Sequence, residues 1–270
     1  MSDFILSRRD NKSKSKTSKL NEIFSNWQGE KENWLFISPH DDDVAIGSGI
    51  LLQKAVSEQI NTTVLIATDG QMGYCSETQI ANIVEIRRTE TINSFKELNI
   101  ENLEWLNFPD GNLNSYMGRR RALEDDYGNI YDHTGLQNSF TYYFRKLKPT
   151  RIFIPTGEDL HTDHKIVFQE TLISLFHATS QIWPELGPSL EKFPEVYEMA
   201  VYCDFNGLPD IKIECSEQIF QNKMNAIKSY ESQKNIIDKL VGKIQSGGPV
   251  EYFRDIRFNL YSAAVYQDVF

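Results

Sequence analysis

Four short apolar runs alternate with four helical patterns in the first two thirds of this chain of 270 residues. The apolar runs have the length of strands and lie at residues 35–38, 63–68, 103–108 and 151–155. Apolar residues at helical spacing follow these runs at residues 46–59, 79–98, 137–147 and 164–177. Such alternation is typical of βαβ units, in which helices cover both faces of a parallel sheet. The sequence therefore predicts a Rossmann-like three-layer α/β fold with a mainly parallel sheet.

The two ends of the chain differ from this pattern. Residues 1–30 include a tract rich in Lys, Arg and Ser, so we predict a flexible basic arm followed by a short helix. Residues 31–270 have a length suited to one large α/β unit, and we expect a single domain there. Further strands are expected at 197–202 and 211–213, and a helix is expected to begin after Ser216.

Composition and charge exclude several classes of protein. The formal net charge is −10, so the chain lacks the cationic surface that a general nucleic-acid binder needs. No run approaches the roughly 20 apolar residues of a membrane-spanning helix, and stable membrane insertion is not expected. The three cysteines have no CxxC spacing and indicate free thiols in a reducing compartment. We predict a cytoplasmic protein; its oligomeric state stays open, with a homo-oligomer as one alternative.

A polar cluster follows each of the four apolar runs. The clusters lie at residues 40–43, 69–73, 109–112 and 161–164. In open parallel α/β sheets, ligands bind in the crevice beyond the carboxyl ends of the strands. The topology therefore brings four clusters that are distant in sequence to one edge of the sheet. We expect the functional site at that C-terminal edge.

The first and last clusters contain the donors of a catalytic metal site. His40 and Asp43 are three residues apart, and His164 arrives from the fourth cluster. Two imidazoles and one carboxylate with an open fourth position are the composition of a catalytic zinc site. A zinc ion in such a site activates water and polarises a carbonyl group.

Neighbouring residues supply the groups that acid–base chemistry needs. Asp42 lies beside a predicted ligand and would act as general base toward the attacking water. His161 would stabilise the developing oxyanion or protonate the leaving amine. Asp163 would orient the His161 ring through its second nitrogen.

Several motifs occur in a fixed order between residues 32 and 235. They are HxDD at 40–43, TDGQMG at 68–73, RxxE at 87–90, PDGNL at 109–113, HTDH at 161–164 and SQ at 232–233. In spacing and order, this set resembles the PIG-L/LmbE-like zinc-dependent N-acetylglucosamine de-N-acetylases. The resemblance implies an enzyme that hydrolyses the N-acetyl, or another N-acyl, group of a small amino-sugar derivative or glycoconjugate.

The same resemblance implies roles for individual residues. By motif position, it implies Zn²⁺, or Fe²⁺ in the cell, on His40, Asp43 and His164. It also implies Asp42 as the base and His161 as the electrophilic helper.

Two further residues are implied to support or contact the substrate, and four positions depart from the family pattern, among them Thr162 in place of the proline of HPDH. Arg87 and Asp110 would contact the sugar or support the site. The family's HPDDE reads HDDDV here, because Asp41 replaces proline and Val44 replaces the closing glutamate. Gln71 replaces the glutamate of the family's TxGExG motif.

These residues also allow other interpretations. Carboxylates at 41–43 could simply cap a helix N-terminus, and Arg87 could form a structural ion pair with Glu90 or Asp110. A receiver-like signalling domain also places adjacent aspartates after its first strand, around Mg²⁺, but histidines are poor ligands for that ion. A catalytically inactive sugar-binding homologue is a further alternative, as is another amide hydrolase.

Overall fold

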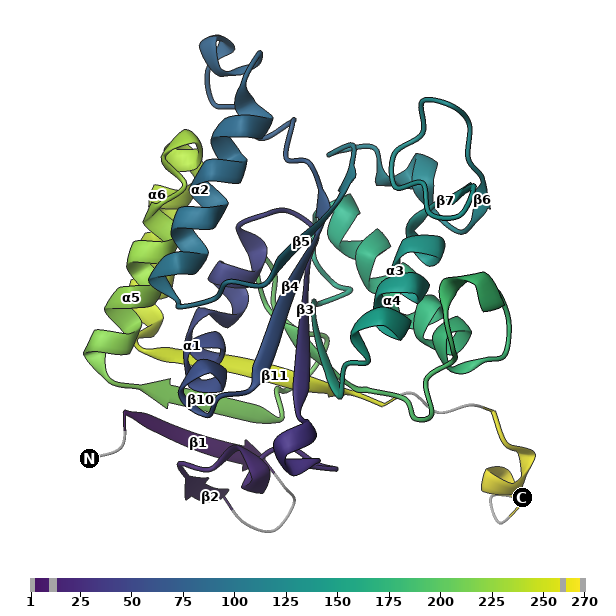
Figure 1. Cartoon of the computed structure of the whole chain (residues 1–270). Coiled ribbons are helices and arrows are strands. Elements are labelled where there is room, and N and C mark those ends of the chain that lie inside the picture. Colours follow the sequence, from purple (N-terminus) through teal and green to yellow (C-terminus); the bar gives the residue numbers. More distant parts are fainter. Residues whose placement is uncertain (1–2, 10–13, 258–260, 268–270) are drawn as a thin grey trace.

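The computed structural model describes residues 3–9, 14–257 and 261–267, and a nine-stranded sheet dominates this part of the chain (Figure 1). Its strands in chain order are β1 (Phe4–Arg9), β2 (Lys14–Thr17), β3 (Asn33–Ser38), β4 (Asn61–Thr68), β5 (Leu103–Phe108), β8 (Arg151–Pro155), β9 (Glu195–Met199), β10 (Ile211–Cys215) and β11 (Val250–Ile256). Two very short strands, β6 (Arg120–Arg121) and β7 (His133–Thr134), pair separately in the loop before the third long helix.

The sheet has a parallel half and an antiparallel half. Its strand order is β2-β1-β10-β11-β9-β8-β3-β4-β5. The five strands from β9 to β5 run parallel to one another. The other four strands extend the sheet with antiparallel pairs beyond β9. The predicted Rossmann-like fold with a mainly parallel central sheet is therefore confirmed, and the antiparallel extension adds to it.

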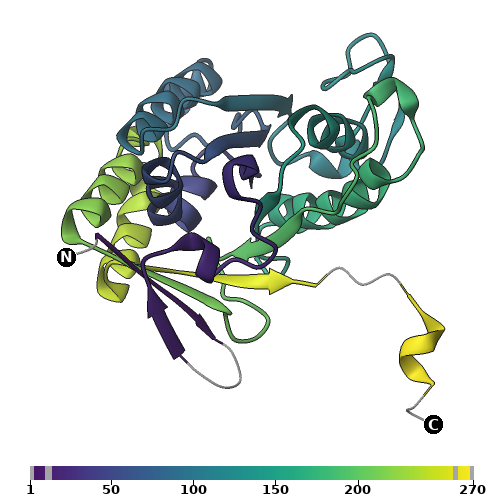
Figure 2. The same ribbon diagram turned by 60° about the horizontal axis from the view of Figure 1, so that its bottom comes forward.

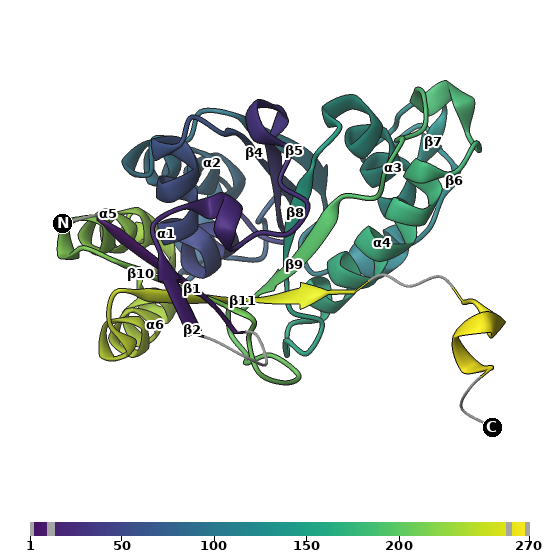
Figure 3. The same cartoon turned by 90° about the horizontal axis from the view of Figure 1, so that it is seen from below.

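Helices cover both faces of the sheet and complete three layers (Figure 3). One face carries α1 (Asp43–Ser57), α2 (Ile83–Glu97), α5 (Glu217–Lys228) and α6 (Lys234–Gly247), and the other carries α3 (Leu136–Leu147) and α4 (Thr162–Thr179). No helix among the described residues is both long and apolar enough to cross a membrane.

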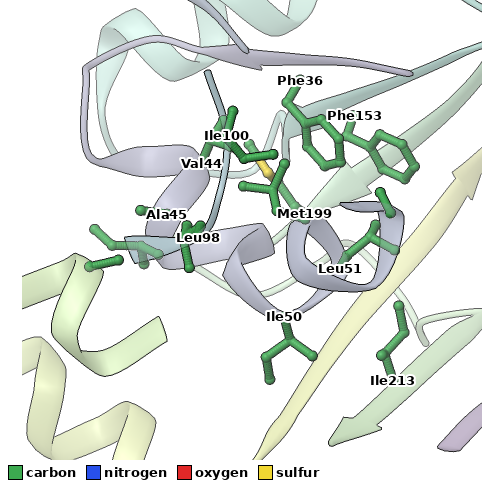
Figure 4. Packing of buried hydrophobic residues seen from close by; sticks show 14 of the residues in the cluster. Phe36, Val44, Ala45, Ile50, Leu51, Leu98, Ile100, Phe153, Met199 and Ile213 are labelled. Atoms are coloured by element: carbon green, nitrogen blue, oxygen red, sulfur yellow. The ribbon is translucent and has the colours of Figure 1, made fainter. Parts of the chain in front are cut away.

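The apolar run of β3 is continuous because both faces of this strand are buried. Phe36 belongs to the core cluster beneath α1 and α2, whereas Leu35 and Ile37 belong to the cluster beneath α3 and α4. Phe36 stacks on Phe153 of the neighbouring β8 with ring centroids 4.4 Å apart. Figure 4 shows this aromatic pair beside the apolar residues of α1. Packing on both faces of the sheet therefore fixes the end of β3, where the polar cluster and α1 begin.

The prediction of a flexible N-terminal arm is wrong for the described residues of that segment. Residues 4–9 form β1, which pairs antiparallel with β10 and with β2, at one edge of the sheet (Figure 2). Phe4 and Leu6 alternate with more exposed residues and are buried in the main core. The short predicted helix is a single turn at Leu20–Glu22. Residues 10–13 of the basic tract lie outside the described residues, and a single domain over 31–270 stays a prediction.

A buried ion pair joins the residue before β3 to the first residue of β8. Glu32 accepts hydrogen bonds from Arg151 Nε at 2.9 Å and Nη2 at 3.0 Å, and from Trp34 Nε1 at 2.7 Å. The Arg151 guanidinium also donates to Tyr197 Oη and lies over the ring of Phe24 at 5.2 Å. A buried ion pair of this kind leaves an uncompensated charge when one partner is removed.

We expect Glu32→Ala to lower the free energy of unfolding by about 3–5 kcal/mol, because Arg151 would remain buried without its counterion. Burial opposes the charged form of Glu32, but hydrogen bonds, first from Arg151 and then from Gln28 and Trp34, lower its pKa in the folded state. This contribution is therefore complete above the unfolded-state pKa of the carboxyl and is lost as the pH falls through the folded-state value. Urea unfolding at two pH values measures both effects.

The matched control is Asp238→Ala, which breaks an exposed pair with Lys234. This variant should change the free energy of unfolding by at most about 0.5 kcal/mol. Equal effects of Glu32→Ala and Asp238→Ala would contradict the expectation.

Candidate active site

Three side chains from distant parts of the chain meet at the carboxyl ends of β3 and β8. His40 lies in the turn after β3, Asp43 begins α1, and His164 lies in the first turn of α4. Nδ1 of His40 and Nε2 of His164 lie 3.2 Å and 3.1 Å from Asp43 Oδ2, and the two nitrogens are 3.2 Å apart. These three atoms form the His–Asp–His triangle. The structure thus brings together the three residues that the sequence suggested as metal ligands.

The size and chemistry of the His–Asp–His triangle fit a transition-metal ion. Ligand atoms of tetrahedral zinc stand about 3.3 Å apart, given metal–ligand distances of about 2.0–2.1 Å. All three side chains are more than nine-tenths buried, and Asp43 Oδ1 has no hydrogen-bond partner among the described residues. A wider grouping, with His161 in place of Asp43, has ligand atoms within 4.8 Å of one another. We favour Asp43, because its three separations match a coordination polyhedron more closely.

Carboxylates lie within ion-pair distance of the outer nitrogen of each imidazole in the His–Asp–His triangle. His40 Nε2 lies 3.2 Å from Asp110 Oδ1 and 3.4 Å from Asp163 Oδ2. His164 Nδ1 lies 3.2 Å from Asp159 Oδ2. Contacts of this kind fix the tautomer and the ring orientation of metal-binding histidines. The inner nitrogens of both rings face each other and Asp43 Oδ2.

The surrounding charges favour a cation at this point. Burial disfavours charged imidazoles, but contacts with Asp110, Asp163 and Asp43 raise the pKa of His40 well above its ordinary value. Burial likewise opposes the charge of His164, whereas Asp43 and the hydrogen bond with Asp159 raise its pKa to about 9. Burial would raise the pKa of Asp43, yet His164 and His40 hold it well below its usual range. A divalent cation would satisfy the same carboxylates in place of imidazole protons.

Asp42 lies next to the His–Asp–His triangle without being part of it. It precedes α1 as the N-cap residue, and its backbone carbonyl accepts the N–H of Ile46 at 3.1 Å. Its carboxylate is buried, and its Oδ1 is 3.5 Å from Arg87 Nη2. Burial raises the pKa of Asp42 to about 6, with further contributions from Asp43 and Asp41 and opposition from Arg87. A nearby metal cation would favour the ionised form, which is the form that a base needs.

His161 lies beside His40 and is exposed. It is the N-cap of α4, and its ring centroid is 4.4 Å from that of His40. Burial of part of the ring, together with His40 and His164, lowers the pKa of His161, which favours a neutral imidazole. Its Nδ1 accepts the backbone N–H of Asp163 at 3.2 Å, so the proton belongs on Nε2.

The predicted orientation of His161 by the Asp163 carboxylate is corrected by this geometry. The contact to His161 comes from the backbone N–H of Asp163. The carboxylate turns the other way, where Oδ2 accepts the N–H of Gly111 at 2.9 Å and approaches His40. The side chain of Asp163 therefore braces the turn after β5 and the first imidazole.

Arg87 and Asp110 both belong to the site, but through protein contacts. The Arg87 side chain is only 4% exposed, and its Nε lies 2.9 Å from Asp41 Oδ1. In the described part of the chain, Arg87 pairs with neither of the two partners expected from the sequence. Glu90 instead accepts the N–H and hydroxyl of Ser232. Asp110 contacts His40 with one oxygen, and its Oδ2 accepts the N–H of Met72 at 3.1 Å.

Two residues that border the site were missed by sequence reasoning. Asp159 binds His164, as described, and its Oδ2 also accepts the backbone N–H of Tyr202 at 3.2 Å. The Tyr202 ring stacks on His164 with centroids 5.3 Å apart. The position of Asp159 could have indicated its role, because it is a carboxylate in the polar segment that follows β8. Tyr202 follows β9 in an ordinary loop, and nothing in its sequence context marks it.

The comparisons with known proteins agree with this fold and site. The model of the GlcNAc-PI de-N-acetylase (PIG-L) family matches residues 35–173, which is more than half of the chain. The chain therefore belongs to the PIG-L family, and its resemblance to these deacetylases is confirmed. The matched segment runs from β3 to α4 and includes every residue of the His–Asp–His triangle.

Individual relatives cover most of the chain at low identity. A Bacillus subtilis protein described as a probable N-acetyl-alpha-D-glucosaminyl L-malate deacetylase 2 is 26% identical over 230 residues, which are 82% of this chain and 92% of that protein. The N,N'-diacetylchitobiose deacetylase of Pyrococcus horikoshii superposes with a TM-score of 0.70 at 20% identity, covering 93% of this chain and 92% of the other. GalB, a 4-carboxy-2-hydroxymuconate hydratase of Pseudomonas putida, shares the fold with a TM-score of 0.64 at 14% identity, over 86% and 98% of the two chains. The fold alone therefore does not fix the reaction.

Proposed function

We propose that this chain is a metal-dependent N-deacetylase that hydrolyses the N-acetyl, or another N-acyl, group of an amino-sugar derivative. The observation that carries the proposal is the His–Asp–His triangle, whose three separations of 3.1–3.2 Å fit one ion. Membership of the PIG-L family supports the deacetylase activity. The descriptions of the Bacillus and Pyrococcus relatives support an N-acetylated sugar as substrate.

His40, Asp43 and His164 would hold the metal, which we propose to be Zn²⁺, with Fe²⁺ as the alternative in the cell. When bound, this ion supplies Lewis acidity that activates water and polarises the amide carbonyl. Asp110 and Asp159 keep the two imidazoles in the tautomers that such binding needs. Asp163 would also help to fix the tautomer of His40.

Two residues of this chain would move the protons of the reaction. The Asp42 carboxylate would accept a proton from the water that attacks the carbonyl carbon. The Nε2–H of His161, on the open side of the site, would donate a hydrogen bond to the developing oxyanion or a proton to the leaving amine. Water adds across the amide bond, so the products are a carboxylate, such as acetate, and a free amino sugar.

Arg87 and Asp110 are proposed to support the site, because the contacts of both are with protein groups. Family membership argues against the receiver-like alternative, whose Mg²⁺ would not need two imidazoles. A catalytically inactive homologue stays as an outcome of the experiment below. The cytoplasmic location and the small-molecule partner are part of the same proposal.

The direct test measures acetate and free amine from a panel of N-acetylglucosamine derivatives, including N,N'-diacetylchitobiose and N-acetylglucosaminyl malate. We expect equal amounts of both products, loss of activity after chelation, and recovery when zinc or iron is restored. Protein that carries a full equivalent of metal and yet releases no acetate from any N-acylated sugar would contradict the deacetylase proposal.

A further inference from the structure

The aspartate that replaces the family's proline, Asp41, is bonded through both its side chain and its backbone carbonyl. Its Oδ1 and Oδ2 lie 2.9 Å and 3.0 Å from Arg87 Nε, and Arg87 Nη2 also bonds Oδ1. Thr91 Oγ1 donates to Oδ2 at 3.0 Å, and the hydroxyl of Tyr230 donates to the Asp41 carbonyl at 2.6 Å. The side chain of Asp41 is thus bonded to α2, and its backbone carbonyl is bonded to Tyr230.

Arg87 stands between Asp41 and the proposed base. The same Nη2 that bonds Asp41 lies 3.5 Å from Asp42 Oδ1, which is at the limit of a hydrogen bond. Among the described residues, these two carboxylates are the only ion-pair partners of Arg87. Arginine–carboxylate pairs are strongest when two N–H groups engage one carboxylate, and Asp41 receives that arrangement. Among the described residues, the Asp42 carboxylate makes only this long hydrogen-bond contact, and its other lone pairs are open.

The guanidinium also supports the loop after β4. A Cβ atom on Gly70 would lie 2.9 Å from Arg87 Nε, and one on Gly73 would lie 2.2 Å from Nη1. Gly70 also has a φ of +71°, which favours glycine. The two glycines of the TDGQMG motif therefore let the loop lie directly on Arg87. Met72, between them, bonds Asp110 and so connects this loop to His40.

We propose that Asp41 is a positioning residue, which holds Arg87 on itself and so keeps the Asp42 carboxylate available as a base. The inference rests on the proposed function, because Asp42 acts as a base only in that reaction. Without the Asp41 charge, the buried Arg87 cation has one carboxylate left within reach. It would then close onto Asp42 and occupy the lone pairs that accept the proton. A proline at this position offers no such counterion, so the proposed pairing of position 41 with Arg87 depends on the aspartate of this chain.

The test is a double-mutant cycle of Asp41→Asn, Arg87→Gln and the double variant, with kinetics and bound metal measured on each. We expect Asp41→Asn to lower kcat by about 10- to 100-fold, with KM changed by less than about 3-fold and metal content unchanged. The double variant removes the cation as well, and we expect it to be at least about 5-fold faster than Asp41→Asn. A merely structural pair would instead lose as much or more activity in the double variant, and that result would overturn the inference.

Two further measurements separate this inference from the proposed function. Glu32→Gln weakens another buried carboxylate–arginine pair, remote from the site, and it should lower stability but leave kcat unchanged. A crystal structure of Asp41→Asn should show Arg87 engaging Asp42 with two N–H groups. An Arg87 that stays in place would overturn the positioning role even if no substrate has been found, whereas a wild-type enzyme without activity would count against the proposed function only.

Discussion

Asp42→Asn is expected to lower kcat for deacetylation by about 10²- to 10⁴-fold, the range that a positioned general base contributes. Asparagine has nearly the same shape but cannot accept the proton of the attacking water. Asp42 supplies none of the three atoms of the His–Asp–His triangle, so bound metal should remain at the wild-type level. Steady-state kinetics and elemental analysis on the same preparation measure both quantities.

The control for Asp42 is the same chemical change at an exposed carboxylate beside the site. Glu158 follows β8 and contacts Asn206 rather than any residue of the His–Asp–His triangle. Glu158→Gln should retain kcat within about 2-fold, as expected for a surface substitution. If Asp42→Asn were as active as this control, the base would have to be another group.

His161→Ala is expected to lower kcat by on the order of 10²-fold or more, again with metal retained. The reason is the Nε2–H donor, which the backbone N–H of Asp163 leaves free by occupying Nδ1. A series of N-acylated amines with falling basicity separates the two roles of this donor. A loss that shrinks as the amine becomes less basic indicates proton donation to the leaving group, and a constant loss indicates oxyanion stabilisation.

His133→Ala is the matched control for His161, because His133 lies in β7 and contacts the carbonyl of Tyr131. Its replacement should leave kcat unchanged. Full activity of His161→Ala on every substrate in the series would remove His161 from the mechanism.

The sequence predicted the parallel part of the fold and the main residues of the site because both depend on local patterns. Each apolar run and each helical pattern is a short-range signal, and the carboxyl ends of parallel strands meet at one edge. His40 and His164 are 124 residues apart, yet their meeting follows from the positions of β3 and β8 as neighbours in the sheet. Motif order then separated this arrangement from other folds with aspartates after the first strand.

What the sequence did not predict depends on contacts that leave no local pattern. β1 pairs with β10 more than 200 residues later, and Lys- and Arg-rich residues beside Phe4 and Leu6 obscured its alternation. β11 was missed, although it is the strand that joins β10 to β9. The Arg87 partner was missed because Asp41 stands where the family has proline. Side-chain direction decided the role of Asp163, and spacing alone does not specify direction.

The most direct test of the metal site is the amount of metal bound per chain, measured by elemental analysis on wild type and His164→Ala purified side by side. Removing His164 deletes one corner of the His–Asp–His triangle and leaves Asp43 and His40 without their common partner. We expect close to one equivalent of zinc or iron in the wild type and loss of most of it in the variant. A wild-type protein that takes up no transition metal even when zinc is supplied, or a variant that binds it equally well, would contradict a metal site formed by these three residues.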